Sequence, residues 1–161
     1  MNQANLPPRG GLTEEERMAE AGLSAAEQAA VKARAAELRA EKKNAGAAAK
    51  REQARQGVLE AIEVMSGHDR DLARRFHAIV TEVAPQLEPK TWYGMPAYSL
   101  DGKTLCFFKA SAKFGVRYAT FGFSDVANLD NGDLWPTDFA LVEFTPEVEQ
   151  AVRVLIAKAV N

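Results

Sequence analysis

The stretch Lys90–Tyr98, which reads Lys-Thr-Trp-Tyr-Gly-Met-Pro-Ala-Tyr, is rich in aromatic side chains and begins with a lysine. Aromatic faces can form the wall of a ligand site, and a nearby cation attracts an anion or stacks on a ring. The strands that follow would bring further aromatic and basic side chains beside this stretch. The residues that would form such a ligand-binding surface are Lys90, Trp92, Tyr93, Met95, Tyr98, Phe107, Lys109, Arg117 and Tyr118.

The same stretch also has a structural interpretation. Gly94 permits a positive φ or the close approach of another segment, and Pro96 restricts Met95 to extended backbone. These residues predict a bend that leads the chain into an antiparallel sheet. We expect this bend to be the main role of the stretch, and a ligand site would then need the neighbouring strands.

No catalytic motif is present. Ser99, Ser111 and Ser124 stand in no nucleophile-elbow pattern, and nothing near Cys106 in the sequence would lower its pKa. We therefore expect a buried, inert thiol at Cys106. An enzyme would need a pocket that folding assembles from distant side chains, such as Lys90, Tyr93, Tyr98 and Arg117.

Metal ligands are sparse in the sequence. His68 and His77 are nine residues apart, which separates them by about 13 Å along a helix. No His, Cys or Asp spacing matches a zinc or di-iron site. Asp125, Asp130 and Asp133 share one predicted loop, and their oxygens could hold iron or calcium weakly. The EF-hand spacing is absent, so a solvated loop is the favoured interpretation.

The aromatic residues divide the chain of 161 residues into two parts, since all 13 lie at or after Phe76. Large aromatic side chains contribute about 2–3 kcal/mol each when buried. The Ala-, Glu-, Lys- and Arg-rich first part has the composition of exposed helix. We predict a disordered N-terminus over 1–12, a helical extension over 13–65 and a compact domain over 66–161.

The charge balance excludes few partners but argues against nucleic acid. Lys and Arg number 20 against 22 Asp and Glu, whereas nucleic-acid-binding domains usually carry a basic excess. The run Lys32–Arg55 is a local exception that could bind phosphates or an acidic partner. It contains no aromatic residue for base stacking, so a solvated helix face is favoured there. With one cysteine and no run of about 18 apolar residues, we expect a cytoplasmic protein that does not enter a membrane.

Helices are expected before the sheet. The capping boxes Thr13–Glu16 and Ser24–Glu27 predict one helix ending near Gly22 and a second ending near Lys43. Asn44–Gly46 should interrupt the pattern before a third helix over 47–65. Asp69 is the expected cap of the next helix, which Pro85 ends. The core-facing stripe of that helix is Leu72, Phe76, Ile79, Val80 and Val83.

Strands follow from residue 97 onward. Asp101-Gly102 predicts a two-residue hairpin turn that joins a strand over 97–100 to one over 104–111. The second strand carries aromatic residues on both faces, so we expect it to be central. The remaining expected elements are strands at Phe114–Phe121 and Asp138–Phe144 and a helix at Thr145–Val160. About 4–5 antiparallel strands covered by helices form an α+β fold.

The run Tyr93–Tyr98, followed by Asp101-Gly102-Lys103 and the aromatic strand Leu105–Lys109, resembles the bacterial YdhG-like family. This is a large family of domains of unknown function, some of whose members are called frataxin-like intracellular iron chaperones. Ala119–Asp125 and Leu134–Thr137 resemble one branch of it, and the likeness covers about residues 58–161. The resemblance implies a curved antiparallel sheet covered by helices, and iron as a candidate cofactor. Many relatives have a histidine just after the first long strand, where this chain has Lys113-Phe114.

Two functions follow as hypotheses. The first is a small binding module, frataxin-like, that holds iron or a small ligand near the aromatic surface. The alternative is a protein–protein interaction module that acts through the N-terminal helices without ligand chemistry. Those helices have few large apolar residues and cannot bury much surface alone, so they would pack on the domain, on a second copy or on another protein.

Overall fold

A computed structural model describes residue 13, residues 16–17, residue 19 and residues 21–161. The predicted disordered segment 1–12 lies outside the described residues. The chain forms two units, Met1–Ala47 and Ala48–Asn161. Both predicted capping boxes are present. The Thr13 amide donates to Glu16 at 2.7 Å, and the Ser24 amide donates to Glu27 at 2.9 Å.

Helix α2 runs without a break from Ala25 to Glu63, so the predicted interruption at Asn44–Gly46 is wrong. A glycine in a helix interior costs about 1 kcal/mol relative to alanine. Gly46 stands among alanines, which have the highest helix propensity, and no proline lies nearby. The propensity of the neighbours therefore outweighs the cost of one glycine.

The compact unit includes the last turns of α2 and so begins earlier than residue 66. Val58 and Ile62 are four residues apart on one helix face, and both are fully buried. A Cβ placed on Gly57 would lie 3.9 Å from the Thr91 methyl group of strand β1 (Glu88–Trp92). The end of α2 therefore packs against the first strand of the sheet.

Helix α3 (Gly67–Val83) provides the centre of the core. Its predicted stripe is confirmed, since Leu72, Phe76, Ile79 and Val80 are buried. The Phe76 ring lies 5.4–6.0 Å from rings of three strands. These three rings belong to Tyr98, Phe108 and Phe121.

The sheet has five antiparallel strands in the order β1-β2-β3-β4-β5, so each strand pairs with its neighbour in sequence. Strand β3 (Lys103–Lys109) is central, as predicted. The turn between it and β2 (Met95–Leu100) has φ values of 50° at Asp101 and 80° at Gly102, which confirms the predicted hairpin. The remaining strands are β4 (Ala119–Phe123) and β5 (Asp138–Leu141). The α+β fold class is confirmed.

The strand predicted from Phe114 begins only at Ala119, because residues 111–114 form the short helix α4 (Ser111–Phe114). The Asp69 carboxylate accepts hydrogen bonds from the Ser111 and Ala112 amides at 3.1 and 2.9 Å. Asp69 therefore caps α4, whereas we predicted that it caps its own helix. Gly115, with φ 62°, ends α4 in the left-handed conformation.

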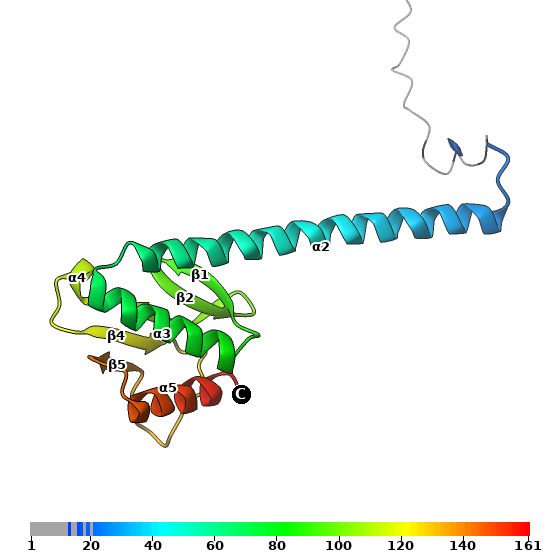
Figure 1. Cartoon of the computed structure of the whole chain (residues 1–161). Coiled ribbons are helices and arrows are strands. Elements are labelled where there is room, and N and C mark those ends of the chain that lie inside the picture. The colour runs from blue at the N-terminus through cyan, green and yellow to red at the C-terminus, as the bar shows by residue number, and fades with distance from the viewer. Residues whose placement is uncertain (1–12, 14–15, 18, 20) are drawn as a thin grey trace, which may run out of the picture. The chain divides into compact units, whose positions relative to one another are not determined.

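Helix α5 (Pro146–Ala159) closes the fold. Thr145 caps it as predicted, since its hydroxyl accepts from the Val148 amide at 3.2 Å. The strand before it ends at Leu141, earlier than the predicted Phe144. Arg153 of α5 binds Glu82 of α3 at 2.9 Å, and the two helices lie side by side (Figure 1).

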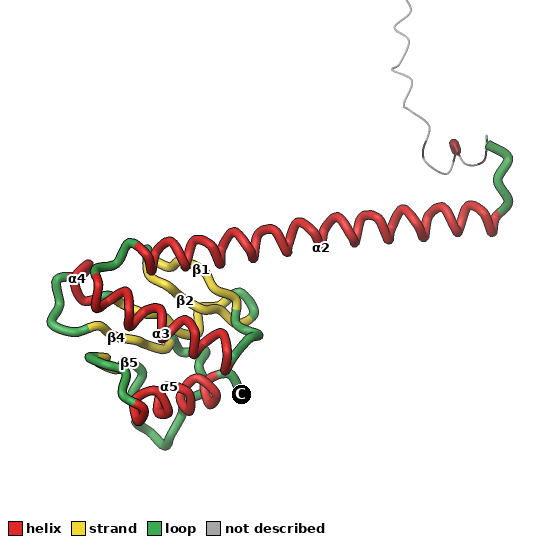
Figure 2. The backbone as a smooth tube through the Cα atoms, viewed as in Figure 1, coloured by secondary structure: helices red, strands yellow, loops and turns green. Residues whose placement is uncertain are grey.

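The helices α2, α3 and α5 supply buried side chains to one face of the sheet, the face of Tyr98, Phe108 and Phe121, whereas the short helix α4 reaches the other face through Phe114, which lies beside Lys109. We call the second face the open face. The longest connection within the sheet is the loop of residues 124–137 between β4 and β5 (Figure 2). None of the helices in the described part of the chain has the length and apolar character that a membrane crossing requires.

Candidate functional site

The motif Lys90–Tyr98 is a complete β-hairpin. Its residues up to Trp92 belong to β1, and those from Met95 belong to β2. Tyr93 and Gly94 form the turn with φ values of 49° and 72°, so the predicted bend is a tight two-residue turn. A Cβ on Gly94 would also collide with the ammonium group of Lys113. The glycine thus serves both the turn and the approach of this lysine.

The strand register divides the predicted site residues between two faces. Trp92 pairs with Met95, and Lys90 pairs with Ala97, which pairs in turn with Phe107. Directly opposite residues share a face. By this register, five of the predicted site residues belong to the open face: Lys90, Trp92, Met95, Phe107 and Lys109.

Tyr98 points to the opposite face and does not join the other candidates. It pairs with Cys106, and its ring packs edge-on against Phe76 in the core. Its hydroxyl lies 2.9 Å from Nδ1 of His77. Burial raises the pKa of Tyr98 well above its usual value. Tyr98 is therefore a neutral core residue whose one polar atom is satisfied within the fold.

Aromatic side chains form a continuous group on the open face. The Trp92 ring lies 5.3 Å from the Phe107 ring and 5.1 Å from the Tyr93 ring, and Tyr93 is 81% exposed. Gly122 on β4 makes room for this group, because a Cβ there would lie 2.5 Å from Cζ of Phe107 and would also meet Asp138. A larger residue at position 122 would displace the Phe107 ring.

Cations lie beside the aromatic group. The Lys109 and Lys113 ammonium groups lie 5.1 and 5.5 Å from the centre of the Phe114 ring, and the Arg117 guanidinium lies 5.1 Å from that of Tyr118. A shallow depression of about 380 Å³ opens here. The residues that line it are Lys109, Val116, Arg117, Tyr118 and Thr120.

These cations have no carboxylate partner in the described part of the chain: Lys109, Lys113 and Arg117 form no ion pair there. The sheet face therefore combines exposed rings with uncompensated positive charge. We call this surface the open-face patch. It consists of Trp92, Tyr93, Phe107, Lys109, Lys113, Phe114, Arg117 and Tyr118. The predicted residue Met95 has the alternation of this face but is only 8% exposed, so it does not form part of the accessible surface.

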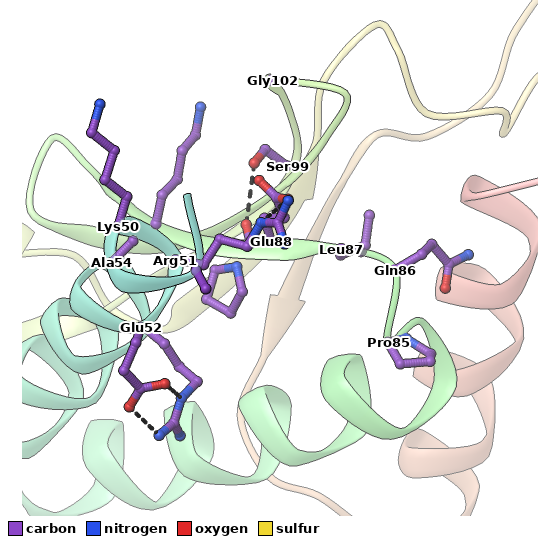
Figure 3. A pocket seen from close by; sticks show the side chains of 14 residues that line it. Lys50, Arg51, Glu52, Ala54, Pro85, Gln86, Leu87, Glu88, Ser99 and Gly102 are labelled. Carbon is purple, nitrogen blue, oxygen red and sulfur yellow. Dashed lines mark hydrogen bonds and ion pairs between the residues drawn. The ribbon is translucent and has the colours of Figure 1, made fainter. Parts of the chain in front are cut away.

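A second cavity, of about 700 Å³, was not predicted. It lies between α2 and β1 (Figure 3). Lys90 lines it, so this predicted residue belongs to the groove at the sheet edge. Arg51 reaches from α2 to Glu88 of β1 at 3.0 Å. The sequence signal was the basic run Lys32–Arg55, whose last residues line this groove, but only folding shows that α2 lies along β1.

The acids of the long loop border another cavity. Asp125, Asp130 and Asp133 line a space of about 460 Å³ together with Trp135. Within the described residues, no three His, Cys, Asp or Glu side chains are arranged to hold a metal ion. The residues present therefore do not fit an iron site of that kind.

The remaining reactive groups are occupied or inaccessible. Burial raises the pKa of the Cys106 thiol, which is consistent with the inert cysteine that we predicted. The two histidines have separate partners. His68 Nε2 lies 2.7 Å from the Val142 carbonyl oxygen, whereas His77 lies beside the Tyr98 hydroxyl. Ser111 and Ser124 hydrogen-bond to Asp69 and to the Thr104 carbonyl, respectively. The hydrogen bonds of Ser111 hold the start of α4, and Cys106 is buried.

No protein family, no curated protein and no solved structure matches the chain. The resemblance to the YdhG-like family therefore rests on the quoted residues alone and stays a prediction. The site itself must be interpreted from its geometry. The structure adds Lys113, Phe114 and Gly122 to the predicted surface. Lys113 approaches Gly94, Phe114 contacts Lys109, and Gly122 makes room for Phe107, so their roles depend on tertiary contacts for which the local sequence has little signal.

Proposed function

We propose that residues 48–161 form a YdhG-like binding module whose open-face patch binds a small ligand that combines a planar ring with an anionic group. The observation that carries this proposal is the contact of Trp92 with Phe107 on a sheet face that also presents Lys109 and Arg117. The rings supply stacking surface, and the cations supply charge for the anionic group.

The arrangement favours an organic anion over iron. Iron requires several oxygen, nitrogen or sulfur donors, and the patch contains no carboxylate, imidazole or thiol among its residues. One acid, Asp138, pairs with Gly122 across β4 and β5, and a Cβ on Gly122 would meet both its carboxylate and the Phe107 ring. Iron, which the family resemblance implies, is therefore the less favoured cargo for this surface.

Calorimetry with naphthalene-2-sulfonate tests the proposal. At about 0.3 kcal/mol per non-hydrogen atom, a ligand of this size binds with a Kd of about 1 mM. We expect saturable heat with naphthalene-2-sulfonate and much weaker binding of uncharged 2-naphthol. Lys109→Gln/Arg117→Gln should weaken binding about fivefold. Lys103→Gln, which removes one positive charge at an exposed position outside the patch, is the control and should leave binding unchanged.

No heat with naphthalene-2-sulfonate would rule out the proposal. Equal affinity for 2-naphthol would show that the cations do not take part in binding. A loss of the same size in Lys103→Gln would show that binding depends only on the overall charge.

A second candidate function is protein–protein interaction through the N-terminal helical segment. Val31 and Leu38 are seven residues apart and share a face of α2, and they are 43% and 50% exposed. Light scattering of Val31→Glu/Leu38→Glu tests this function against the control Ala33→Glu/Ala40→Glu. An assembly that the first variant dissociates and the control preserves supports the interaction module. A monomer in all three proteins contradicts self-association.

A further inference from the structure

The groove between α2 and β1 is a cavity of ligand size. Its volume of about 700 Å³ falls within the range of about 300–1,000 Å³ that is usual for small-molecule sites. Three segments form its walls: the α2 residues 48–55, the residues 85–90 at the end of the α3–β1 connection and the start of β1, and the β2–β3 hairpin at Ser99 and Gly102 (Figure 3). We call it the α2–β1 groove, and it is separate from the open-face patch.

The charges of this groove divide into paired and unpaired groups. Glu88 is held by Arg51 at 3.0 Å, and Glu52 is held by Arg55 at 2.7 Å. The hydrogen bonds from Arg55 hold the pKa of Glu52 at about 2, so this carboxylate stays ionised. Both acids of the groove are thus neutralised by arginines.

Two lysines remain. Lys50 on α2 and Lys90 on β1 line the groove, and neither forms an ion pair with any residue that the structure describes. Lys50 extends from α2 on the side away from the Glu52 pair (Figure 3). The groove therefore has an excess of two positive charges, carried by ammonium groups on different elements.

The number of these cations favours a particular anion. A phosphate monoester carries a charge of about −1.5 to −2 at pH 7, which matches two ammonium groups, whereas a carboxylate carries a single negative charge. Arg51 and Arg55 are already engaged, so the anion would contact the two lysines, which bind phosphate as point charges. Apolar groups of Leu87, Pro85 and Ala54 also line the groove and would contact an aliphatic body.

We propose that the α2–β1 groove binds a phosphate monoester with a short apolar body, whose phosphate lies between Lys50 and Lys90. The ligand spans the two elements that the Arg51–Glu88 pair already joins. Binding should therefore also stabilise the packing of α2 on β1.

Titration of the full chain with butyl phosphate, followed by amide NMR shifts, tests this proposal. We expect saturable shifts at Lys90, Ser99 and Gly102. Lys50→Gln/Lys90→Gln should weaken binding about fivefold. Lys42→Gln/Lys43→Gln removes the same charge from α2 outside the groove and should leave the affinity unchanged.

Two further ligands test the roles of the phosphate group and of the apolar body separately. Butyrate should bind more weakly than butyl phosphate, and inorganic phosphate should bind more weakly because it lacks the apolar body. Absent or non-saturable shifts, or an equal loss in the control variant, would overturn the proposed site. Tighter binding of butyrate would overturn the choice of phosphate. Neither result affects naphthalene-2-sulfonate binding at the open-face patch.

Discussion

The carboxylate of Asp69 accepts hydrogen bonds from both the amide and the hydroxyl of Ser111, at 3.1 and 2.8 Å. The two residues belong to different elements, α3 and α4, and Asp69 is only 3% exposed. This contact fixes the start of α4. It thereby positions Lys113 and Phe114, which contribute to the edge of the open-face patch.

Asp69→Asn should destabilise the domain by about 1–3 kcal/mol, because the amide nitrogen cannot accept hydrogen bonds in place of a carboxylate oxygen. Urea unfolding measures the change. Asp71→Asn, at an exposed position of the same helix, is the control and should cost much less. Equal losses in the two variants would contradict the capping role of Asp69.

The pH dependence of this contact has a defined sign. Burial by itself raises the pKa of Asp69, but the hydrogen bonds from Ala112 and Ser111 outweigh it and bring the pKa below the ordinary 3.8. The unfolded chain therefore binds the proton more readily, and the contribution is present above pH 3.8 and lost as the pH falls through the lower folded value. The wild type should lose more stability than Asp69→Asn over this acidic range.

Because of His77, the free energy of unfolding should fall as the pH is lowered from neutral to mildly acidic values. Burial first, and the Arg55 charge second, lower its pKa from the ordinary 6.5. The unfolded state then binds the extra proton below pH 6.5, so the free energy of unfolding decreases as the pH falls through this range. Urea midpoints measured from pH 8 to pH 5 should show a steeper decline in the wild type than in His77→Gln. An equal decline in the wild type and in His77→Gln would contradict this role of His77.

Gly122→Ala should disturb the open-face patch without adding backbone strain, because Gly122 has no positive φ. The new methyl group would meet the Phe107 ring and the Asp138 carboxylate, so the ring must shift away from its place beside Trp92. We expect a changed tryptophan fluorescence spectrum and weaker naphthalene-2-sulfonate binding. An unchanged spectrum with unchanged affinity would show that the position of Phe107 does not matter to the site.

Gly46→Ala should raise the thermal stability of helix α2, since alanine is favoured over glycine by about 1 kcal/mol in a helix interior. No atom lies within 4 Å of the added Cβ, so no collision opposes this gain. Circular dichroism at increasing temperature measures it, with Ala45→Gly as the opposite change. A lower stability in Gly46→Ala would contradict a helix that is continuous through this position.

Much of the fold follows from local sequence signals. The Asp101-Gly102 turn, the Thr145 cap and the stripe of α3 depend on residues close together in the chain, and each is confirmed. The predicted start of β4 was wrong because residues 111–114 form α4, whose first amides donate to Asp69, 42 residues away in the chain. The prediction of a break in α2 was wrong because it gave a single glycine more weight than the alanines around it.

The candidate site was predicted less completely than the fold. The surface residues Trp92, Phe107 and Lys109 do share a face, and they could be grouped from the two-residue period of strands. Tyr98 could not be separated from them without the register of the Tyr93-Gly94 turn, which places it on the buried face. The α2–β1 groove depends on the packing of a helix against the sheet edge, for which the local sequence has no signal.

The most direct test of the open-face patch is the detection of intermolecular NOEs with naphthalene-2-sulfonate bound to the full chain. We predict NOEs from the naphthalene protons to the rings of Phe107 and Trp92, and none to the buried Tyr98 ring. NOEs confined to the α2–β1 groove or to the long loop at Trp135, or no NOEs at saturating ligand, would contradict the proposed binding surface.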